Sequence, residues 1–301
     1  MKENFISRLV RWYKRPNKSA IADLVESLIV IIPVVFLIKT FVFGLYQVPT
    51  GSMETTMLVG ERFFADKVTP YISKPQREEI ISFNNPLHTY SNNWFINLYQ
   101  QYVDWNVINY TKRVIGIPGD HIQGKIEDGK PVVYLNGQKL DESYLNSYPV
   151  ISIFKPAQVS LRTGIPGEIH RRSYDPNKSY QDQPFYRLNS LEVARAKMYL
   201  GGDNIFYPQT PAHDSYGKVK DEYDITLGSD EYWMMGDNRQ GSFDSRDWGP
   251  LNIKKAIFHG RILFRIWSID SDESWWIVDL IKHPVDFFKR VRWSRFFQVL
   301  H

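Results

Sequence analysis

A serine and a lysine, far apart in the sequence, are the residues of this chain best suited to do chemistry. Ser52 lies in the run VPTGSM at residues 48–53, and Lys112 lies in the run YTKR at residues 110–113. A serine hydroxyl is a poor nucleophile until a base removes its proton, and the usual base is histidine. Ser52 lacks the Gly-x-Ser-x-Gly elbow, and no recognisable triad motif includes any of the seven histidines, which are His88, His121, His170, His213, His259, His283 and His301.

Lysine is the other candidate base for Ser52. Its ordinary pKa near 10.4 must fall by about three for the amine to be neutral at physiological pH, which costs about 4 kcal/mol. Lys112 lies in a strand-like run at residues 110–117, in which neighbouring side chains point to opposite faces. We therefore expect one of Lys112 and Arg113 to be buried and the other to face water. Taken alone, a lysine in such a run is usually a solvated strand residue.

A third segment, residues 234–249 (MMGDNRQGSFDSRDWG), is dense in small, turn-forming and charged residues. A loop of this composition can hold side chains with little freedom. Its oxygen ligands also allow a calcium loop, although the EF-hand spacing and terminal glutamate are missing; these ligands are Asp237, Asn238, Asp244 and Asp247. The sequence contains no His-Glu-x-x-His motif and no cysteine, which excludes thiol proteases, cysteine zinc sites and disulfides. We expect neither a metal nor another cofactor.

A long apolar stretch at residues 20–46 precedes these segments, and its core at residues 28–38 is LIVIIPVVFLI. The stretch is long enough to span a bilayer if Glu26 and Lys39 extend toward opposite interfaces, and Pro33 is tolerable in a membrane helix. A cleaved signal peptide is the alternative, but no pair of small residues of the Ala-x-Ala kind follows the stretch. We predict an uncleaved, single-pass transmembrane anchor.

Basic residues are concentrated at the two ends of the chain, in residues 1–19 and 271–301. Because those near the anchor mostly precede it, we expect residues 1–19 to lie in the cytoplasm and everything after the anchor to lie outside. Basic ends that also carry aromatic and apolar runs favour a lipid bilayer as partner over nucleic acid.

The rest of the chain has the pattern of a mainly β protein. Its 301 residues, 43% hydrophobic and 15% aromatic, are enough for a substantial core. Short strand-like runs alternate with turn signals, and Asn136-Gly137 predicts a hairpin with a tight type I′ turn. Residues 191–200 form the one convincing helical stretch. We assign residues 47–120 and 232–270 to a catalytic core and residues 121–231 to an inserted, variable β-domain.

Two aromatic concentrations lie apart from the candidate site. Residues 94–105 carry two tryptophans, a phenylalanine and two tyrosines, which fits either an outward surface that dips into the membrane interface or ordinary core. The basic aromatic tail at residues 271–301 has the composition of an interfacial amphipathic helix. A helix that docks on the body of the protein is the alternative for this tail.

Together, the three candidate segments resemble those of type I signal peptidases, the bacterial membrane-bound Ser/Lys endopeptidases that remove signal peptides from exported preproteins. Gly51-Ser52-Met53 is similar to the nucleophile box, residues 110–120 (YTKRVIGIPGD) to the lysine box, and residues 236–246 (GDNRQGSFDSR) to the last box, in the family's order. The resemblance implies an anchor in the bacterial cytoplasmic (inner) membrane, an extracytoplasmic catalytic domain, and cleavage after an Ala-x-Ala-like segment. It says little about residues 150–230 or the tail.

The resemblance also implies roles for the matching residues. Ser52 is then the nucleophile and Lys112 the general base, while the backbone N–H of Ser52 and the hydroxyl of Thr50 form the oxyanion hole. Ser242 matches a serine that hydrogen-bonds and orients the lysine. The remaining matches are a pair that braces the last loop, Asp244 and Arg246, and three residues that line shallow pockets for small substrate side chains, Tyr46, Val48 and Thr111.

Two stretches depart from the family pattern. After Ser-Met the family usually has x-Pro-Thr-Leu, whereas this chain has Glu54-Thr55-Thr56-Met57, and the usual Arg-Gly-Asp is replaced by Arg77-Glu78-Glu79. Two other functions remain open. A self-cleaving repressor-type Ser/Lys peptidase would need a DNA-binding head where this chain has an apolar anchor. A catalytically silent, signal-peptidase-like membrane scaffold would tolerate loss of Ser52.

Overall fold

The computed structural model describes residues 19–104, 107–156, 167–202, 204–214, 216–254, 258–271, 273 and 276–300. The predicted cytoplasmic segment at residues 1–19 therefore lies outside the described residues except for its last member, and so do Trp105 and Trp275 of the two aromatic concentrations.

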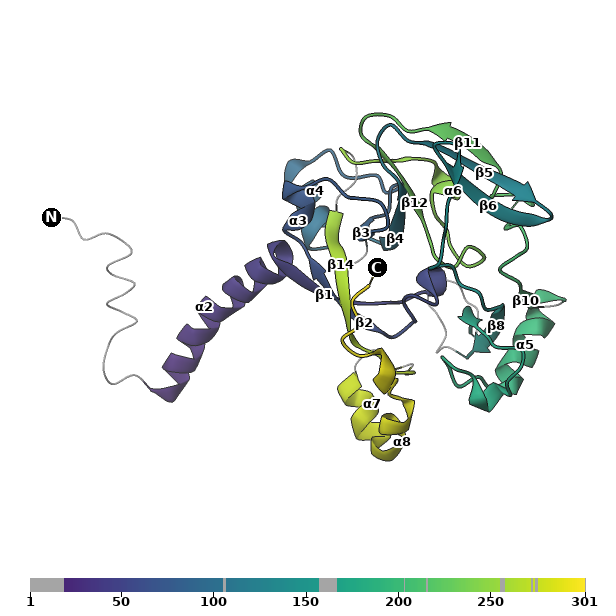
Figure 1. The fold of residues 1–301 in the computed structure, drawn as a ribbon. Helices are drawn as coiled ribbons and strands as arrows, with labels where there is room; N and C mark the ends of the chain where they lie inside the picture. Colours follow the sequence, from purple (N-terminus) through teal and green to yellow (C-terminus); the bar gives the residue numbers. More distant parts are fainter. Residues whose placement is uncertain are drawn as a thin grey trace.

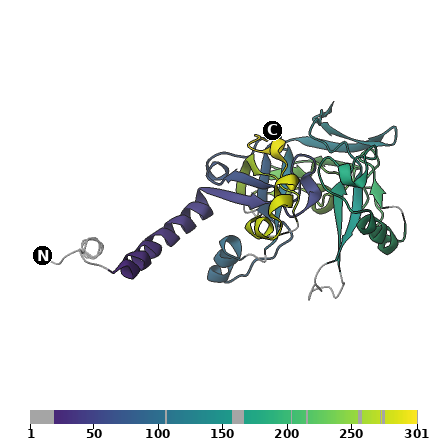
Figure 2. The same ribbon diagram turned by 90° about the horizontal axis from the view of Figure 1, so that it is seen from below.

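The apolar stretch forms one long helix, α2 (Ala20–Phe41), which extends away from the rest of the molecule in Figures 1 and 2. Most of its side chains are exposed, and by length and composition it could cross a membrane over Asp23–Phe41. The helix is shorter than the predicted 20–46, because the chain becomes strand β1 (Phe43–Gln47) at once. Val42 is the single residue between them: its N–H donates to Ile38 O at 2.8 Å and its carbonyl accepts from Lys67 N at 3.0 Å.

The three candidate segments lie on or beside a seven-stranded antiparallel sheet with the order β1-β2-β14-β3-β4-β12-β13. The predicted mainly β fold with an apolar N-terminal helix is thus confirmed. After β1, the strands of this sheet are β2 (Arg62–Asp66), β3 (Ile80–Asn84), β4 (Asn109–Gly116), β12 (Glu231–Met235), β13 (Leu251–Asn252) and β14 (Phe258–Trp267).

All strands of two smaller antiparallel sheets come from residues 121–226, with the orders β11-β5-β6-β7 and β10-β8-β9. This range falls within the predicted insert, whose limits as a separate domain stay a prediction. The strands are β5 (His121–Glu127), β6 (Lys130–Leu135), β7 (Gln138–Lys139), β8 (Val150–Lys155), β9 (Glu168–Ser173), β10 (Ile205–Phe206) and β11 (Tyr223–Thr226).

Two local predictions are confirmed by the backbone. Asn136 and Gly137 have φ angles of 52° and 82° between β6 and β7, the left-handed conformations that a type I′ turn requires. The predicted helix is α5 (Ser190–Leu200), in which Asn189 caps the start by accepting from Leu191 N. It ends at Gly201, whose φ of 69° suits glycine.

The aromatic stretch contains a helix that the sequence pattern did not reveal, α4 (Trp94–Tyr102). Asn93 caps its first turn by accepting from Phe95 N and Ile96 N. None of its residues is buried, and Trp94 and Phe95 are 67% and 73% exposed. The core interpretation of this stretch is therefore wrong for α4, which projects from the body in Figure 2.

The tail forms two short helices, α7 (Trp276–Lys282) and α8 (Pro284–Arg290), and then returns to the body. Phe287 and Val291 form a buried cluster with Ile269 that also contacts Trp267. These contacts fit the docking alternative, and a single interfacial amphipathic helix is not what the described residues form. The remaining short elements are α3 (Thr69–Ile72), α6 (Ser245–Trp248) and the 3₁₀ turns η1 (Gly51–Met53), η2 (Tyr180–Asp182) and η3 (Trp293–Arg295).

Candidate active site

The fold brings Ser52 and Lys112 into direct contact. Ser52 lies in the 3₁₀ turn η1, just beyond β1, and Lys112 lies on β4 opposite Ile81 of β3. The Lys112 Nζ atom is 2.9 Å from the Ser52 Oγ atom, although the two residues are 60 positions apart. Both are buried, with 2% of Lys112 and 8% of Ser52 exposed. A base and a nucleophile at hydrogen-bond distance form the minimal arrangement for serine catalysis.

Burial changes the protonation of Lys112. Removal from water lowers its pKa from 10.5 to about 8; Asp244 opposes this effect and the positive charge of Arg246 adds to it. At neutral pH about a tenth of the molecules therefore carry an uncharged amine, which can accept a proton. An exposed strand lysine would remain almost wholly protonated, so the solvated interpretation of Lys112 does not hold.

Arg113 contradicts the expectation that one of the two neighbouring cations faces water. Its guanidinium makes two hydrogen bonds to the Asp237 carboxylate, at 2.9 and 2.7 Å, and both side chains are fully buried. It also lies 4.1 Å from the centre of the Tyr144 ring. Lys112 and Arg113 are neighbours on one strand and both are buried, so a neutralising partner takes the place of solvent for Arg113.

Residues 236–246, which we call the last loop, hold the turn that carries Ser52. The Asn238 backbone N–H donates to Ser52 O at 3.1 Å, and its side-chain amide donates to Gly51 O at 2.9 Å. Sequence reasoning considered Asn238 only as a calcium ligand. The only sign in the sequence that Asn238 could hold the Ser52 turn was its position in a loop rich in turn-forming and charged residues.

Asp244 and Arg246 brace this loop from within. Arg246 Nε and Nη2 donate to the Asp244 carboxylate at 2.8 and 2.9 Å, and Arg246 Nη1 donates to Asp221 at 2.8 Å. Burial alone would raise the pKa of Asp244, but the charge and hydrogen bonds of Arg246 outweigh it and hold that pKa well below the usual range. Asp244 also accepts from Gly236 N, so the ion pair fixes both ends of the loop.

Ser242 is buried beside Gly236, but its hydroxyl has no hydrogen-bond partner among the described residues. The hydrogen bond to Lys112 expected from the resemblance is therefore not made. A Cβ atom at Gly236 would lie 2.3 Å from Ser242 Oγ and 2.4 Å from Ser52 O. Glycine at this position is what allows the last loop to approach the serine turn so closely.

Arginine and lysine side chains already pair with the carboxylates that suggested a calcium loop. Asp237 pairs with Arg113, Asp244 pairs with Arg246, and Asp247 lies 2.6 Å from Lys220 Nζ. Within the described part of the chain, no group of three or more potential ligand residues could hold a metal ion. These side chains therefore act as a buried ion-pair network.

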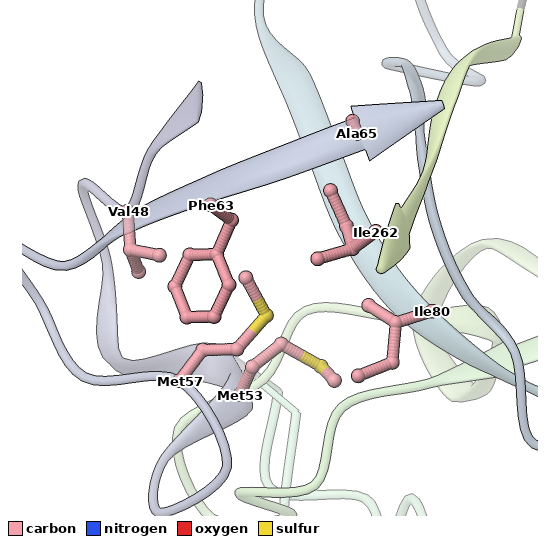
Figure 3. Packing of buried hydrophobic residues seen from close by; sticks show 7 residues of the cluster. All are labelled: Val48, Met53, Met57, Phe63, Ala65, Ile80 and Ile262. Carbon is pink, nitrogen blue, oxygen red and sulfur yellow. The ribbon is translucent and has the colours of Figure 1, made fainter. Parts of the chain in front are cut away.

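The oxyanion and pocket candidates lie on elements next to Ser52. Thr50 is extended and exposed immediately before η1. Val48 belongs to the buried cluster in Figure 3, where Phe63 lies beside it, and Tyr46 packs against that cluster while donating to His259 O at 3.0 Å. Thr111 is half-buried on β4 and lies outside this cluster.

Glu54, at the first departure from the family pattern, is completely buried and binds two residues of the predicted insert. Its carboxylate accepts from Ser173 N, Ser173 Oγ and Tyr186 OH, each at 2.7 Å. Burial raises its pKa, and Arg172 and these hydrogen bonds offset part of that effect. At the second departure, Arg77 pairs with Asp120. Sequence reasoning did not anticipate either partner set.

Comparison with known proteins defines the class of this protein. The family described as Signal peptidase, peptidase S26, matches residues 21–267, which include both Ser52 and Lys112. The chain belongs to this family and is a serine peptidase, that is, a hydrolase.

Individual relatives are similar over most of their length. Signal peptidase I of Buchnera aphidicola subsp. Schizaphis graminum (strain Sg) is 30% identical over 281 residues, covering 86% of this chain and 79% of the relative. Signal peptidase I of Buchnera aphidicola subsp. Acyrthosiphon pisum (strain APS) is 27% identical, covering 87% and 80%. Signal peptidase I of Bacillus amyloliquefaciens is 27% identical, covering 81% and 87%.

Proposed function

We propose that this chain is a membrane-bound signal peptidase that cleaves exported preproteins after an Ala-x-Ala-like segment, with Ser52 as nucleophile and Lys112 as general base. The observation that carries the proposal is the 2.9 Å contact between Lys112 Nζ and Ser52 Oγ, in surroundings that lower the lysine pKa to about 8. The family match and the names of the relatives support the substrate class.

In the first half-reaction, neutral Lys112 takes the proton of Ser52 while Oγ attacks the scissile carbonyl carbon. The tetrahedral oxyanion is stabilised by the N–H of Ser52 and the hydroxyl of Thr50, and loss of one such donor costs on the order of 100-fold in rate. When the intermediate collapses, the C–N bond breaks and the Lys112 ammonium donates its proton to the departing amine. The signal peptide is then held as an ester on Ser52.

In the second half-reaction, water hydrolyses that ester. Lys112, neutral again, removes a proton from the water as its oxygen attacks the ester carbonyl, and the proton then returns to Ser52 Oγ. Tyr46, Val48 and Thr111 would shape shallow pockets that admit only small substrate side chains, while the ion pair of Asp244 and Arg246 would hold the last loop in place. The Ser242 hydroxyl, which is buried and has no hydrogen-bond partner among the described residues, is available to orient the ammonium form of Lys112.

The same proposal places α2 across the bacterial cytoplasmic membrane, with residues 1–19 inside and the sheets outside. Support comes from the apolar α2 and from α4, whose exposed aromatic residues suit a lipid interface. The rings of Phe41, at the end of α2, and Tyr102, at the end of α4, are 5.9 Å apart. Both elements would therefore meet the same membrane surface.

The test is cleavage of a preprotein in detergent or vesicles by the wild type, Ser52→Ala and Lys112→Met. Lys125→Met is a matched control, because Lys125 also lies in a strand but is exposed. We expect Ser52→Ala and Lys112→Met to lose at least about 10³-fold in rate and the control to remain near wild type. A catalytically silent scaffold predicts instead no difference between the wild type and Ser52→Ala, and that result would disprove the dyad.

A further inference from the structure

The last ten described residues, 291–300, form a segment that runs from α8 back along β14, which we call the return segment (Figure 1). Arg265 N donates to Gln298 O at 2.8 Å and Leu300 N donates to Leu263 O at 3.0 Å, so the segment pairs with a strand of the catalytic sheet. At its start, Val291 packs in the cluster with Phe287. The return segment is therefore held at both ends by the body of the protein.

One side chain of this segment reaches the nucleophile loop, which we define as residues 54–61. Arg295 Nε donates to Glu61 Oε1 at 2.6 Å, and Arg295 Nη2 donates to the carbonyls of Thr55 and Thr56 at 3.0 and 3.2 Å. A single guanidinium thus binds both the first part and the end of a loop that begins two residues after Ser52.

Glu61 is suited to be the fixed point of this contact. It is completely buried and also accepts from Leu58 N at 2.8 Å and Ser268 Oγ at 2.7 Å. Burial by itself would raise the pKa of Glu61, but the hydrogen bond and charge of Arg295, with the charge of Arg265, lower it overall. A carboxylate that stays ionised inside the protein holds a cationic partner firmly.

The geometry of these contacts favours arginine over lysine. A planar guanidinium can serve a carboxylate and two carbonyls at once, whereas a lysine ammonium is a single point charge on a flexible stem. The loop transmits its position to Ser52 through the backbone, because Met57 N donates to Met53 O at 2.8 Å and Glu54 N donates to Gly51 O at 3.2 Å. A shift of the loop would therefore move η1 relative to Lys112.

We propose that Arg295 is a positioning residue for Ser52, and that the return segment clamps the nucleophile loop in its reactive conformation. This inference rests on the proposed function for its kinetic consequence, but not for its structural one. Arg295 lies beyond residues 21–267, the range of the family match, so the clamp is a feature of this chain that the match does not cover. Arg265 also pairs with Glu61, at 2.9 Å, and should keep the loop folded when Arg295 is replaced.

The test compares full-length Arg295→Met, Arg295→Lys and Lys289→Met with wild type. Lys289→Met is the matched control, since it removes one positive charge from an exposed position on α8. For Arg295→Met we expect kcat for preprotein cleavage to fall about tenfold or more with KM within about twofold. Arg295→Lys should be intermediate and Lys289→Met unchanged. Backbone amides of residues 54–61 should exchange hydrogen at least tenfold faster in Arg295→Met, less so in Arg295→Lys, and at the wild-type rate in Lys289→Met.

The two measurements separate the possible failures. Unchanged amide exchange in the nucleophile loop of Arg295→Met overturns the clamp. The assay is repeated at a temperature lowered by the change in Tm of the variant. If the fall in kcat then disappears, it reflects general destabilisation, and the clamp is overturned. Faster exchange together with equal cleavage by wild type and Ser52→Ala would leave the clamp standing and reject the proposed function.

Discussion

Replacing Lys112 by methionine is expected to stabilise the protein at pH 7 while it abolishes catalysis. Burial lowers the pKa of Lys112 from 10.5 to about 8, so below pH 8 the folded protein carries an ammonium that the unfolded chain keeps in water. A pKa difference of about 2.5 corresponds to about 3.4 kcal/mol. Loss of the 2.9 Å hydrogen bond to Ser52 costs about 1 kcal/mol. The free energy of unfolding should therefore rise by about 2 kcal/mol.

The same pKa determines how this gain varies with pH. The folded protein releases the lysine proton near pH 8 and the unfolded chain releases it near pH 10.5, so the unfolded state binds more protons between these values. The wild type consequently becomes more stable as pH rises from 8 to 10.5, whereas the methionine variant lacks this group. The advantage of the variant should shrink by about 2.5 kcal/mol between pH 7 and pH 10.

The measurement is urea unfolding of both proteins in detergent micelles, followed by tryptophan fluorescence at pH 7, 8.5 and 10. Lys125→Met is the control, because it removes an exposed strand lysine and should change the free energy of unfolding by less than about 0.5 kcal/mol. A Lys112→Met protein that is less stable than wild type at pH 7, or a difference that does not vary with pH, would refute the reasoning.

Three further outcomes are expected. Cleavage activity should rise about tenfold per pH unit below pH 7 and level off above pH 8, as the buried lysine loses its proton, and a flat rate profile from pH 6 to 9 would contradict this. Gly236→Ala places a methyl group against Ser52 O, so the free energy of unfolding, measured by thermal unfolding, should fall by about 1–3 kcal/mol and cleavage should slow. Gly202→Ala is the control, because a Cβ atom there would meet nothing within 4 Å. Arg113→Met leaves Asp237 buried without its cation, and urea unfolding should register a loss of about 3–5 kcal/mol; a loss below about 1 kcal/mol would show that the carboxylate finds another partner.

The features that could be predicted from the sequence are those with local causes. The Asn136-Gly137 turn follows from backbone angles that these residue types accept, and α5 from a capping asparagine, a helical stretch and a terminal glycine. The contact of Ser52 with Lys112 came only from the resemblance, because a strand lysine on its own gives no sign that it is buried.

The features that escaped prediction depend on contacts between distant segments. The sequence predicted that either Lys112 or Arg113 would face water. Both are buried, because Arg113 is neutralised by Asp237, which is 124 positions away in the sequence. Glu54 and Glu61 gave no signal, because their partners come from the insert and from the tail. Charge patterns show that ions must be neutralised, but only the folded chain determines which pairs form.

The junction between α2 and β1 has a mechanical consequence. With Val42 as the only residue between helix and strand, and with that residue hydrogen-bonded on both sides, the two elements cannot swing independently. If α2 spans the bilayer as proposed, its tilt sets the tilt of the catalytic sheet, and the height of Ser52 above the lipid is a fixed dimension of the enzyme. Membrane thickness would then control which peptide bond of a preprotein lies at the same height as the serine and is cleaved.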